Sequence, residues 1–236
     1  MADALSEAAE KLLAKNVLDR FTRYVAIQQE ILSSGKSLME ADSYDAAYER
    51  FRVLVKHAEN LWDDACALFE RGSFATALAL TITCLEEIGK ISVSRFQLIV
   101  DEHLRRQGLA PQQAAANLKK GNPFYSHKQK MLIAAGAGAL INSRIDRVLG
   151  LNYVVDFLER TERGEIEILR QNALYTDAND GAIHIPSQRI TRENALFYVA
   201  LAGECLAEVG GLEPDEWGRL LERVQSFEKS TGHEHE

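Results

Sequence analysis

The feature that most restricts the fold of this chain is its scarcity of helix-breaking residues. Its 236 residues include only four prolines and fifteen glycines, and the first proline is Pro111. Proline inside a helix removes a backbone donor and clashes with the preceding turn, so long proline-free stretches of good helix formers favour helices. Strict alternation is confined to the fragment 183–185, and no hairpin is expected. The sequence therefore predicts an all-α fold.

Seven helices are expected from the apolar spacing and from the turn residues between them. Their expected ranges are 5–32, 43–70, 74–106, 123–148, 152–173, 191–209 and 213–228. A weaker helical piece is expected from Pro111, a break is possible at Gly164, and a loop is expected over 175–190. We expect residues 1–229 to form a single domain with its core at about 45–200, followed by a flexible tail over 230–236.

The third expected helix, 74–106, is predicted to be central because apolar residues cover half of its circumference or more. Its narrow polar stripe contains Glu86, Glu87 and Lys90, and Lys90 can pair with either glutamate at helical spacing. One interpretation is a solvated face with a weak ion pair. The other is a carboxylate pair that faces a pocket, with Gly89 allowing another helix or a ligand to approach the backbone.

His127 shares an apolar helix face with Met131 and Ala134, so the pattern predicts that its side chain points inward. Such a histidine is commonly a satisfied core residue. Lys130 lies one turn away, however, and a local group of histidine and lysine can receive a phosphate while the imidazole transfers a proton. Both interpretations of His127 are consistent with the sequence.

A third candidate group lies at the end of the fifth expected helix, where Arg170, Asn172 and Tyr175 follow one another. An arginine near a helix end interacts favourably with the terminal carbonyl groups, which is a purely structural role. Alternatively, the three side chains face a phosphodiester, with Arg170 stabilising its negative charge.

Charge and motifs exclude several classes of protein. With 27 basic and 35 acidic side chains the formal charge is −8, which disfavours a general cationic field for nucleic acid but allows a local basic site. No zinc, phosphate-loop or serine-nucleophile motif is present, so no metal or other cofactor is expected. The longest nearly apolar run, 131–141, is far shorter than the roughly 20 residues of a membrane span. Three separated cysteines favour a reduced, cytoplasmic protein without a membrane partner.

Three blocks of sequence resemble the AbiV-type abortive-infection proteins of the HEPN superfamily. They are residues 74–90, residues 124–130, and residues 169–177 with Pro186 following. The resemblance implies a HEPN-like helical bundle, here with additional N- and C-terminal helices, and a role in bacterial defence against phage. Many HEPN proteins are metal-independent ribonucleases and many are dimers, so it also implies a homodimer that acts on RNA.

One departure from the HEPN pattern affects the catalytic expectation. The usual pattern is an arginine followed four to six residues later by a histidine, and here Tyr175 stands in that place after Arg170. The literal match, Arg52 and His57, lies on a continuous helix where the two side chains point about 140° apart. His127 from another helix is the alternative source of the imidazole.

Two functions remain open from the sequence. In the first, the protein is a metal-independent ribonuclease in which His127, Arg170 and Tyr175 are catalytic. Its partners are then RNA and a phage-encoded activator, and infection starts RNA cleavage or the shutdown of translation. In the second, it is a non-catalytic protein that captures a phage protein, a translation component or a nucleotide. The supporting residues are common to both and are Glu86, Glu87, Lys90, Lys130 and Asn172.

Overall fold

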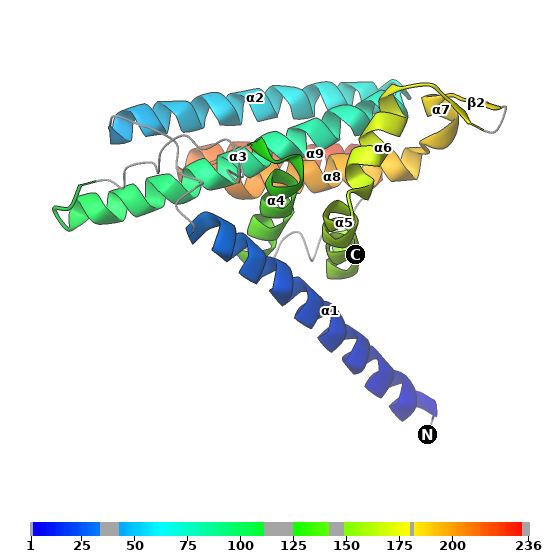
Figure 1. Ribbon diagram of the computed structural model, residues 1–236, viewed down its shortest axis with the longest axis horizontal. Coiled ribbons are helices and arrows are strands. Elements are labelled where there is room, and N and C mark those ends of the chain that lie inside the picture. The colour runs from blue at the N-terminus through cyan, green and yellow to red at the C-terminus, as the bar shows by residue number, and fades with distance from the viewer. Residues whose placement is uncertain (1, 34–42, 111–124, 142–148, 180–181, 233–236) are drawn as a thin grey trace.

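Helix α3 is the element around which the other helices pack in the computed structural model, which describes residues 2–33, 43–110, 125–141, 149–179 and 182–232 (Figure 1). The elements are α1 (Ala2–Ser33), α2 (Tyr44–Glu70), α3 (Phe74–Arg106), α4 (His127–Ile141), α5 (Leu151–Glu162), α6 (Glu165–Leu174), β1 (Asp177–Asn179), β2 (Ala182–His184), α7 (Pro186–Arg189), α8 (Arg192–Val209) and α9 (Pro214–Thr231). Helix α3 contacts α2, α4, α6, α7 and α8. The all-α fold and the central third helix are therefore confirmed.

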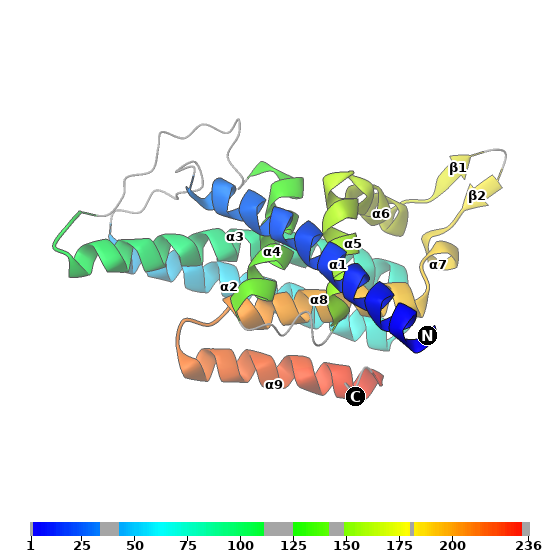
Figure 2. The same ribbon diagram turned by 90° about the horizontal axis from the view of Figure 1, so that it is seen from below.

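The remaining helices cover this centre from two sides. Helix α8 packs on α2, α3 and α4, and α9 packs on the outer side of α8 (Figure 2). On the opposite side, α1 crosses α4 and α5. The apolar core extends from α1 through α3 to α9, and the indole of Trp62 on α2 donates a hydrogen bond of 3.0 Å to the carbonyl of Val199 on α8.

Local capping residues explain most of the helix boundaries. The hydroxyl of Ser43 accepts a hydrogen bond from the amide of Ala46, and that of Thr191 accepts one from Asn194, so α2 and α8 begin where the sequence predicts. Ser73 precedes α3 as expected but makes no side-chain capping bond. Gly164, with φ of +80°, separates α5 from α6 and confirms the predicted break.

Two expectations are wrong here: that residues 175–190 form a plain loop, and that the chain has no hairpin. Strands β1 and β2 pair antiparallel, with Asp177 opposite His184, and the short helix α7 follows them. Each strand has three residues, which is too short for alternating apolar and polar residues to be recognised against a background of turn residues.

The ends of two other helices also differ from expectation. Helix α4 begins at His127 rather than at 123, while Pro123 and residues 142–148 lie outside the described residues, as does the piece expected from Pro111. Helix α9 continues to Thr231, so the segment 230–236 that was expected to be a tail begins inside a helix. Among the described helices, none combines the length and the apolar character needed to cross a membrane.

Candidate functional site

The site is organised by an unusually close crossing of α3 and α4. A Cβ atom built on Gly89 would lie 2.1 Å from the backbone carbonyl oxygen of Lys130, so only a glycine lets the two backbones approach this closely. The expectation that Gly89 admits another helix is thus confirmed. Because the crossing is at Lys130, the first turn of α4 lies directly over Glu86, one turn before Gly89.

Glu86 is the buried acceptor of the site. Its side chain is 5% exposed, and Oε2 accepts hydrogen bonds from Nδ1 of His127 at 2.6 Å and from Nζ of Lys130 at 3.1 Å. The Lys130 side chain is itself 8% exposed. A carboxylate removed from water needs a charged partner and hydrogen bonds, and Lys130 supplies both. The interpretation of this stripe as merely solvated is therefore wrong for Glu86.

His127 is exposed, contrary to the predicted inward orientation. Its side chain is 57% exposed, whereas Met131 and Ala134 on the same helix are buried as predicted. Helical side chains tilt toward the N-terminus, and His127 is the first residue of α4, so its ring extends beyond the packed part of the helix. The result is an imidazole with one nitrogen on a buried carboxylate and its outer edge in solvent.

A second charged pair faces this imidazole from α6. Arg170 donates from Nη2 and Nε to the carboxylate of Glu167 at 2.7 and 3.0 Å, and Gln171 donates to the same carboxylate at 3.0 Å. The Arg170 guanidinium lowers the pKa of Glu167 below its ordinary value. Reciprocally, Glu167 raises the pKa of Arg170, and the charges of Glu86 and Tyr175 add to this. Arg170 thus pairs with a carboxylate rather than with helix-terminal carbonyl groups.

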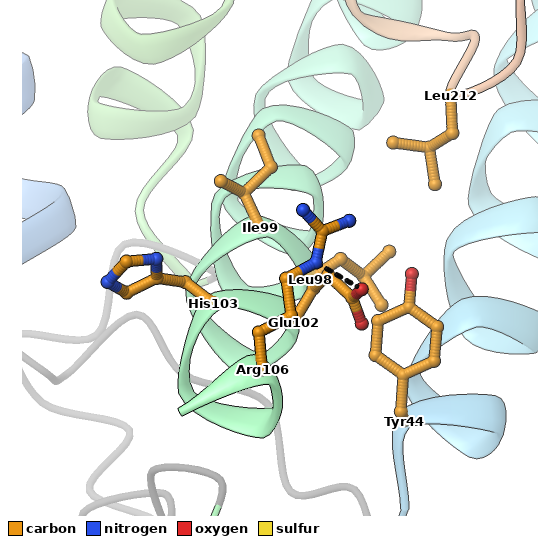
Figure 3. Close-up of a pocket in the computed structure, with 7 residues that line it drawn as sticks. All are labelled: Tyr44, Leu98, Ile99, Glu102, His103, Arg106 and Leu212. Atoms are coloured by element: carbon orange, nitrogen blue, oxygen red, sulfur yellow. Dashed lines mark hydrogen bonds and ion pairs between the residues drawn. The ribbon is translucent and has the colours of Figure 1, made fainter. Parts of the chain in front are cut away.

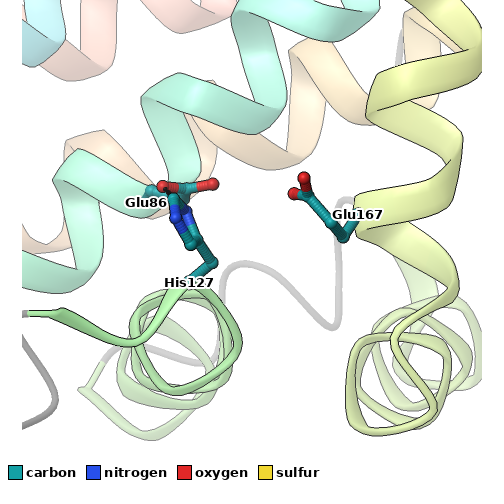
Figure 4. A group of neighbouring side chains, drawn as sticks. All are labelled: Glu86, His127 and Glu167. Carbon is teal, nitrogen blue, oxygen red and sulfur yellow. Dashed lines mark hydrogen bonds and ion pairs between the residues drawn. The ribbon is translucent and has the colours of Figure 1, made fainter. Parts of the chain in front are cut away.

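The side chains of Glu86, His127 and Glu167 converge from α3, α4 and α6 (Figure 4). One potential ligand atom from each lies within 4.8 Å of the other two. Lys130 and Arg170 are each one hydrogen bond from this group, through Glu86 and Glu167. The fold therefore joins the two predicted blocks around His127 and Arg170 into one site.

Not every expected residue belongs to this site. Lys90 donates to both oxygens of Glu87, at 2.7 and 2.8 Å, and the two form a separate pair. Of the polar stripe on α3, Glu86 is the residue that binds His127. Tyr175, directly after α6, is 65% exposed. The Asn172 side chain is half-buried and makes no hydrogen bond among the described residues.

Sequence reasoning missed Glu167. The available signal was its position three residues before Arg170 on one helix, the spacing at which a carboxylate and a guanidinium pair. A prediction that Arg170 forms an ion pair with an acidic residue one turn away would have identified Glu167.

Several hollows in the described part of the surface are lined by residues outside this site. One, of about 310 Å³, lies near the end of α3 and is lined in part by Tyr44, Ile99 and Glu102 (Figure 3). Its acidic group is already engaged, because Arg105 and Arg106 bind Glu102 and lower its pKa to about 2. The hollow therefore offers an apolar and cationic wall together with the imidazole of His103, while its carboxylate stays ionised near neutral pH.

Comparison with known proteins supports the family resemblance. The family model HEPN_AbiV, described as AbiV, matches residues 46–207, a range that runs from α2 into α8 and contains Glu86, His127 and Arg170. Neither the curated proteins nor the solved structures provide a match. Helices α1 and α9 lie outside the matched range.

Proposed function

The chain belongs to the AbiV family of abortive-infection HEPN proteins, and we propose that its site on α3, α4 and α6 cleaves RNA without a metal ion. The observation that carries the proposal is the hydrogen bond between Nδ1 of His127 and the buried carboxylate of Glu86, at 2.6 Å. A buried acid on one imidazole nitrogen fixes the ring and its tautomer and stabilises the imidazolium, while Nε2 remains available to a substrate.

The reaction that suits this arrangement is attack by a ribose 2′-hydroxyl on the adjacent phosphorus. His127 Nε2 takes the hydroxyl proton as the new P–O bond forms, and the bond to the 5′-oxygen breaks. The leaving 5′-oxygen takes a proton from water, and the imidazolium of His127 returns its proton to the resulting hydroxide. The products are a 2′,3′-cyclic phosphate and a 5′-hydroxyl.

Arg170 is suited to stabilise the developing negative charge. It uses Nε and Nη2 on Glu167, which leaves the hydrogens of Nη1 for a phosphate oxygen. Glu167 holds the guanidinium in place, and Tyr175 lies near enough to interact with it electrostatically. Lys130 is buried against Glu86, so it balances the negative charge of that carboxylate and does not bind RNA.

A specific observation also favours a second candidate function. The cations Lys90, Lys130 and Arg170 are each paired with a carboxylate, so the site has little net positive charge to attract RNA. In that interpretation the polar network fixes the packing of α3, α4 and α6. The protein then acts by capturing a phage protein, a translation component or a nucleotide.

Three proteins compared in EDTA distinguish these functions: the wild type, His127→Gln and Arg170→Ala. Each is incubated with total RNA, with and without extract of phage-infected cells, after its melting temperature is measured. We expect cleavage by the wild type, a loss of about 10²–10⁴-fold without the histidine, and a loss of about 10²–10³-fold without the arginine. His103→Gln, an exposed histidine on α3, is the matched control and should cleave normally.

Two outcomes refute the catalytic proposal. If the wild type leaves RNA intact under every condition yet blocks phage in cells, the capture function replaces it. Equal cleavage by all the proteins places the chemistry elsewhere, and Arg52 with His57 is the next pair to test.

We also propose that the protein acts as a homodimer. Large apolar side chains are exposed on α6 and on the segment that follows it, next to Arg170; they are Ile168, Leu174, Tyr175, Ile183 and Ile185. Exposed large apolar side chains are a feature of surfaces that bind other proteins. Light scattering at low micromolar concentration should give the mass of a dimer, and a monomer would contradict the proposal.

A further inference from the structure

One oxygen of the site has no partner to explain it. Glu86 Oε1 is buried and makes no hydrogen bond within the described part of the chain, while Oε2 serves both His127 and Lys130. A buried carboxylate oxygen that is left unsatisfied costs free energy, and such atoms in folded proteins usually have a water, an ion or a ligand as partner. Glu86 lies beside an imidazole and a second carboxylate, and this set of groups indicates which ligand would suit the oxygen.

We propose that Glu86, His127 and Glu167 bind one Zn²⁺-like transition-metal ion and that its binding inhibits the RNA cleavage described above. The metal site itself is independent of that proposed function, and only the inhibition rests on it. One imidazole and two carboxylates form a ligand set that is common for Zn²⁺ and related ions, with water completing the coordination. Mg²⁺ is a poor fit because it prefers oxygen ligands and retains most of its water.

The observed spacing requires only small adjustments: Nδ1 of His127 and Oε2 of Glu86, now 2.6 Å apart, must move apart, and ligand atoms that are farther from one another must approach. The three ligand atoms lie within 4.8 Å of one another, whereas tetrahedral ligands about 2.1 Å from zinc are roughly 3.4 Å apart. Glu86 is fixed by burial, but the side chains of His127 and Glu167 are 57% and 33% exposed. Rotation of the exposed His127 side chain, and of the partly exposed Glu167 side chain once it is released from Arg170 and Gln171, can close the site without moving a helix.

The surrounding charges set the strength and the consequence of binding. Lys130 and Arg170 already neutralise the two carboxylates, so the ion should bind more weakly than zinc in a structural site, where no cation competes. A metal bound to both Glu86 and His127 replaces the hydrogen bond between them. The imidazole then can no longer accept a proton, which is why occupancy inhibits acid–base catalysis.

The test is to titrate the protein, without RNA, with Zn²⁺ followed by calorimetry and with Co²⁺ followed by visible absorption. The protein is the full chain, treated with EDTA and dialysed, with His233→Ala and His235→Ala to remove tail histidines from the measurement. We expect one equivalent of metal to bind. Glu167→Gln and His127→Gln should weaken binding by at least about 10–100-fold, the typical loss for removing even an outer-shell group.

Glu165→Gln is the matched control, because this glutamate lies on the same helix and pairs with Arg163 and Arg160 instead. Its binding should equal that of the wild type. Absence of binding, or equal binding by Glu167→Gln and Glu165→Gln, would overturn the site. If the wild type cleaves RNA, added Zn²⁺ should suppress cleavage and EDTA should restore it, and full activity with metal bound would overturn the inhibition alone. A chain that binds metal but never cleaves RNA refutes the proposed nuclease and leaves the metal site established.

Discussion

Replacing Gly89 by alanine should separate the two helices that build the site. A Cβ at this position would lie 2.1 Å from the carbonyl oxygen, 2.6 Å from the carbonyl carbon and 2.7 Å from the Cα of Lys130. Ordinary contact begins near 3.4 Å, so the backbones must move about 1.3 Å apart. No rotamer change can relieve the clash, because all three atoms belong to the backbone of α4.

The expected magnitude follows from two opposing effects. Alanine in a helix interior is normally more stable than glycine by roughly 0.5–1 kcal/mol. Overpacking a core costs about 1–3 kcal/mol, and a clash between backbones belongs at the upper end. We therefore expect a net loss of about 2 kcal/mol in the free energy of unfolding, or about 4–8 °C in melting temperature for a chain of this length.

Gly218→Ala is the control for this measurement. Gly218 lies in α9, and a Cβ there would meet no atom within 4 Å. The same substitution should therefore raise the melting temperature by about 1–4 °C. Thermal and urea unfolding of both variants give the comparison. An increase for Gly89→Ala similar to that for Gly218→Ala would refute the close crossing of α3 and α4.

Two further predictions concern stability. Burial alone would raise the pKa of Glu59, but the hydrogen bond and charge of Arg219, with the charges of Arg223 and Lys56, lower it below the ordinary value. The carboxylate thus contributes stability that is present above its unfolded pKa and is lost as pH falls through the lower folded pKa. Glu59→Gln should lower the free energy of unfolding by about 1–3 kcal/mol at pH 7. Between pH 7 and pH 3, urea unfolding of this variant should depend less on pH than that of the wild type. The same pH dependence in both proteins would contradict this prediction. Thr191→Ala should lower the free energy of unfolding by about 1 kcal/mol, because the threonine hydroxyl caps α8. Ser73→Ala should lower it much less, since the serine hydroxyl makes no capping bond. Equal losses of melting temperature in the two variants would contradict the assignment of these caps.

The parts of the fold that sequence predicted correctly depend on local signals. The limits of α3 follow from Gly72 and Gly108, which adopt positive φ on either side of it, and the start of α8 follows from Thr191. The orientation of His127 could not be predicted in this way. Its spacing with Met131 is correct, but its exposure depends on where α4 begins and how far its neighbours extend.

Several residues of the candidate site were identified from the sequence, but Glu167 and the way the residues come together were not. Glu86 and His127 are 41 residues apart in the chain, and their contact depends on the crossing of two helices at Gly89. The sequence indicated that glycine as a point of close approach but not which helix approaches. Glu167 joins the site only because the turn at Gly164 directs α6 back toward α3.

We propose that a fixed imidazole lets a ribose hydroxyl cleave RNA without a metal ion. The chemical groups at the ends of the cleaved strand test this proposal. An RNA oligonucleotide that the wild type cleaves in EDTA is compared with the same strand carrying a 2′-deoxy sugar at the cleaved position, and the ends are identified by mass spectrometry. We expect a 2′,3′-cyclic phosphate and a 5′-hydroxyl from the first strand and no cut at that position in the second. A 3′-hydroxyl with a 5′-phosphate, or cleavage at the 2′-deoxy position, would contradict it.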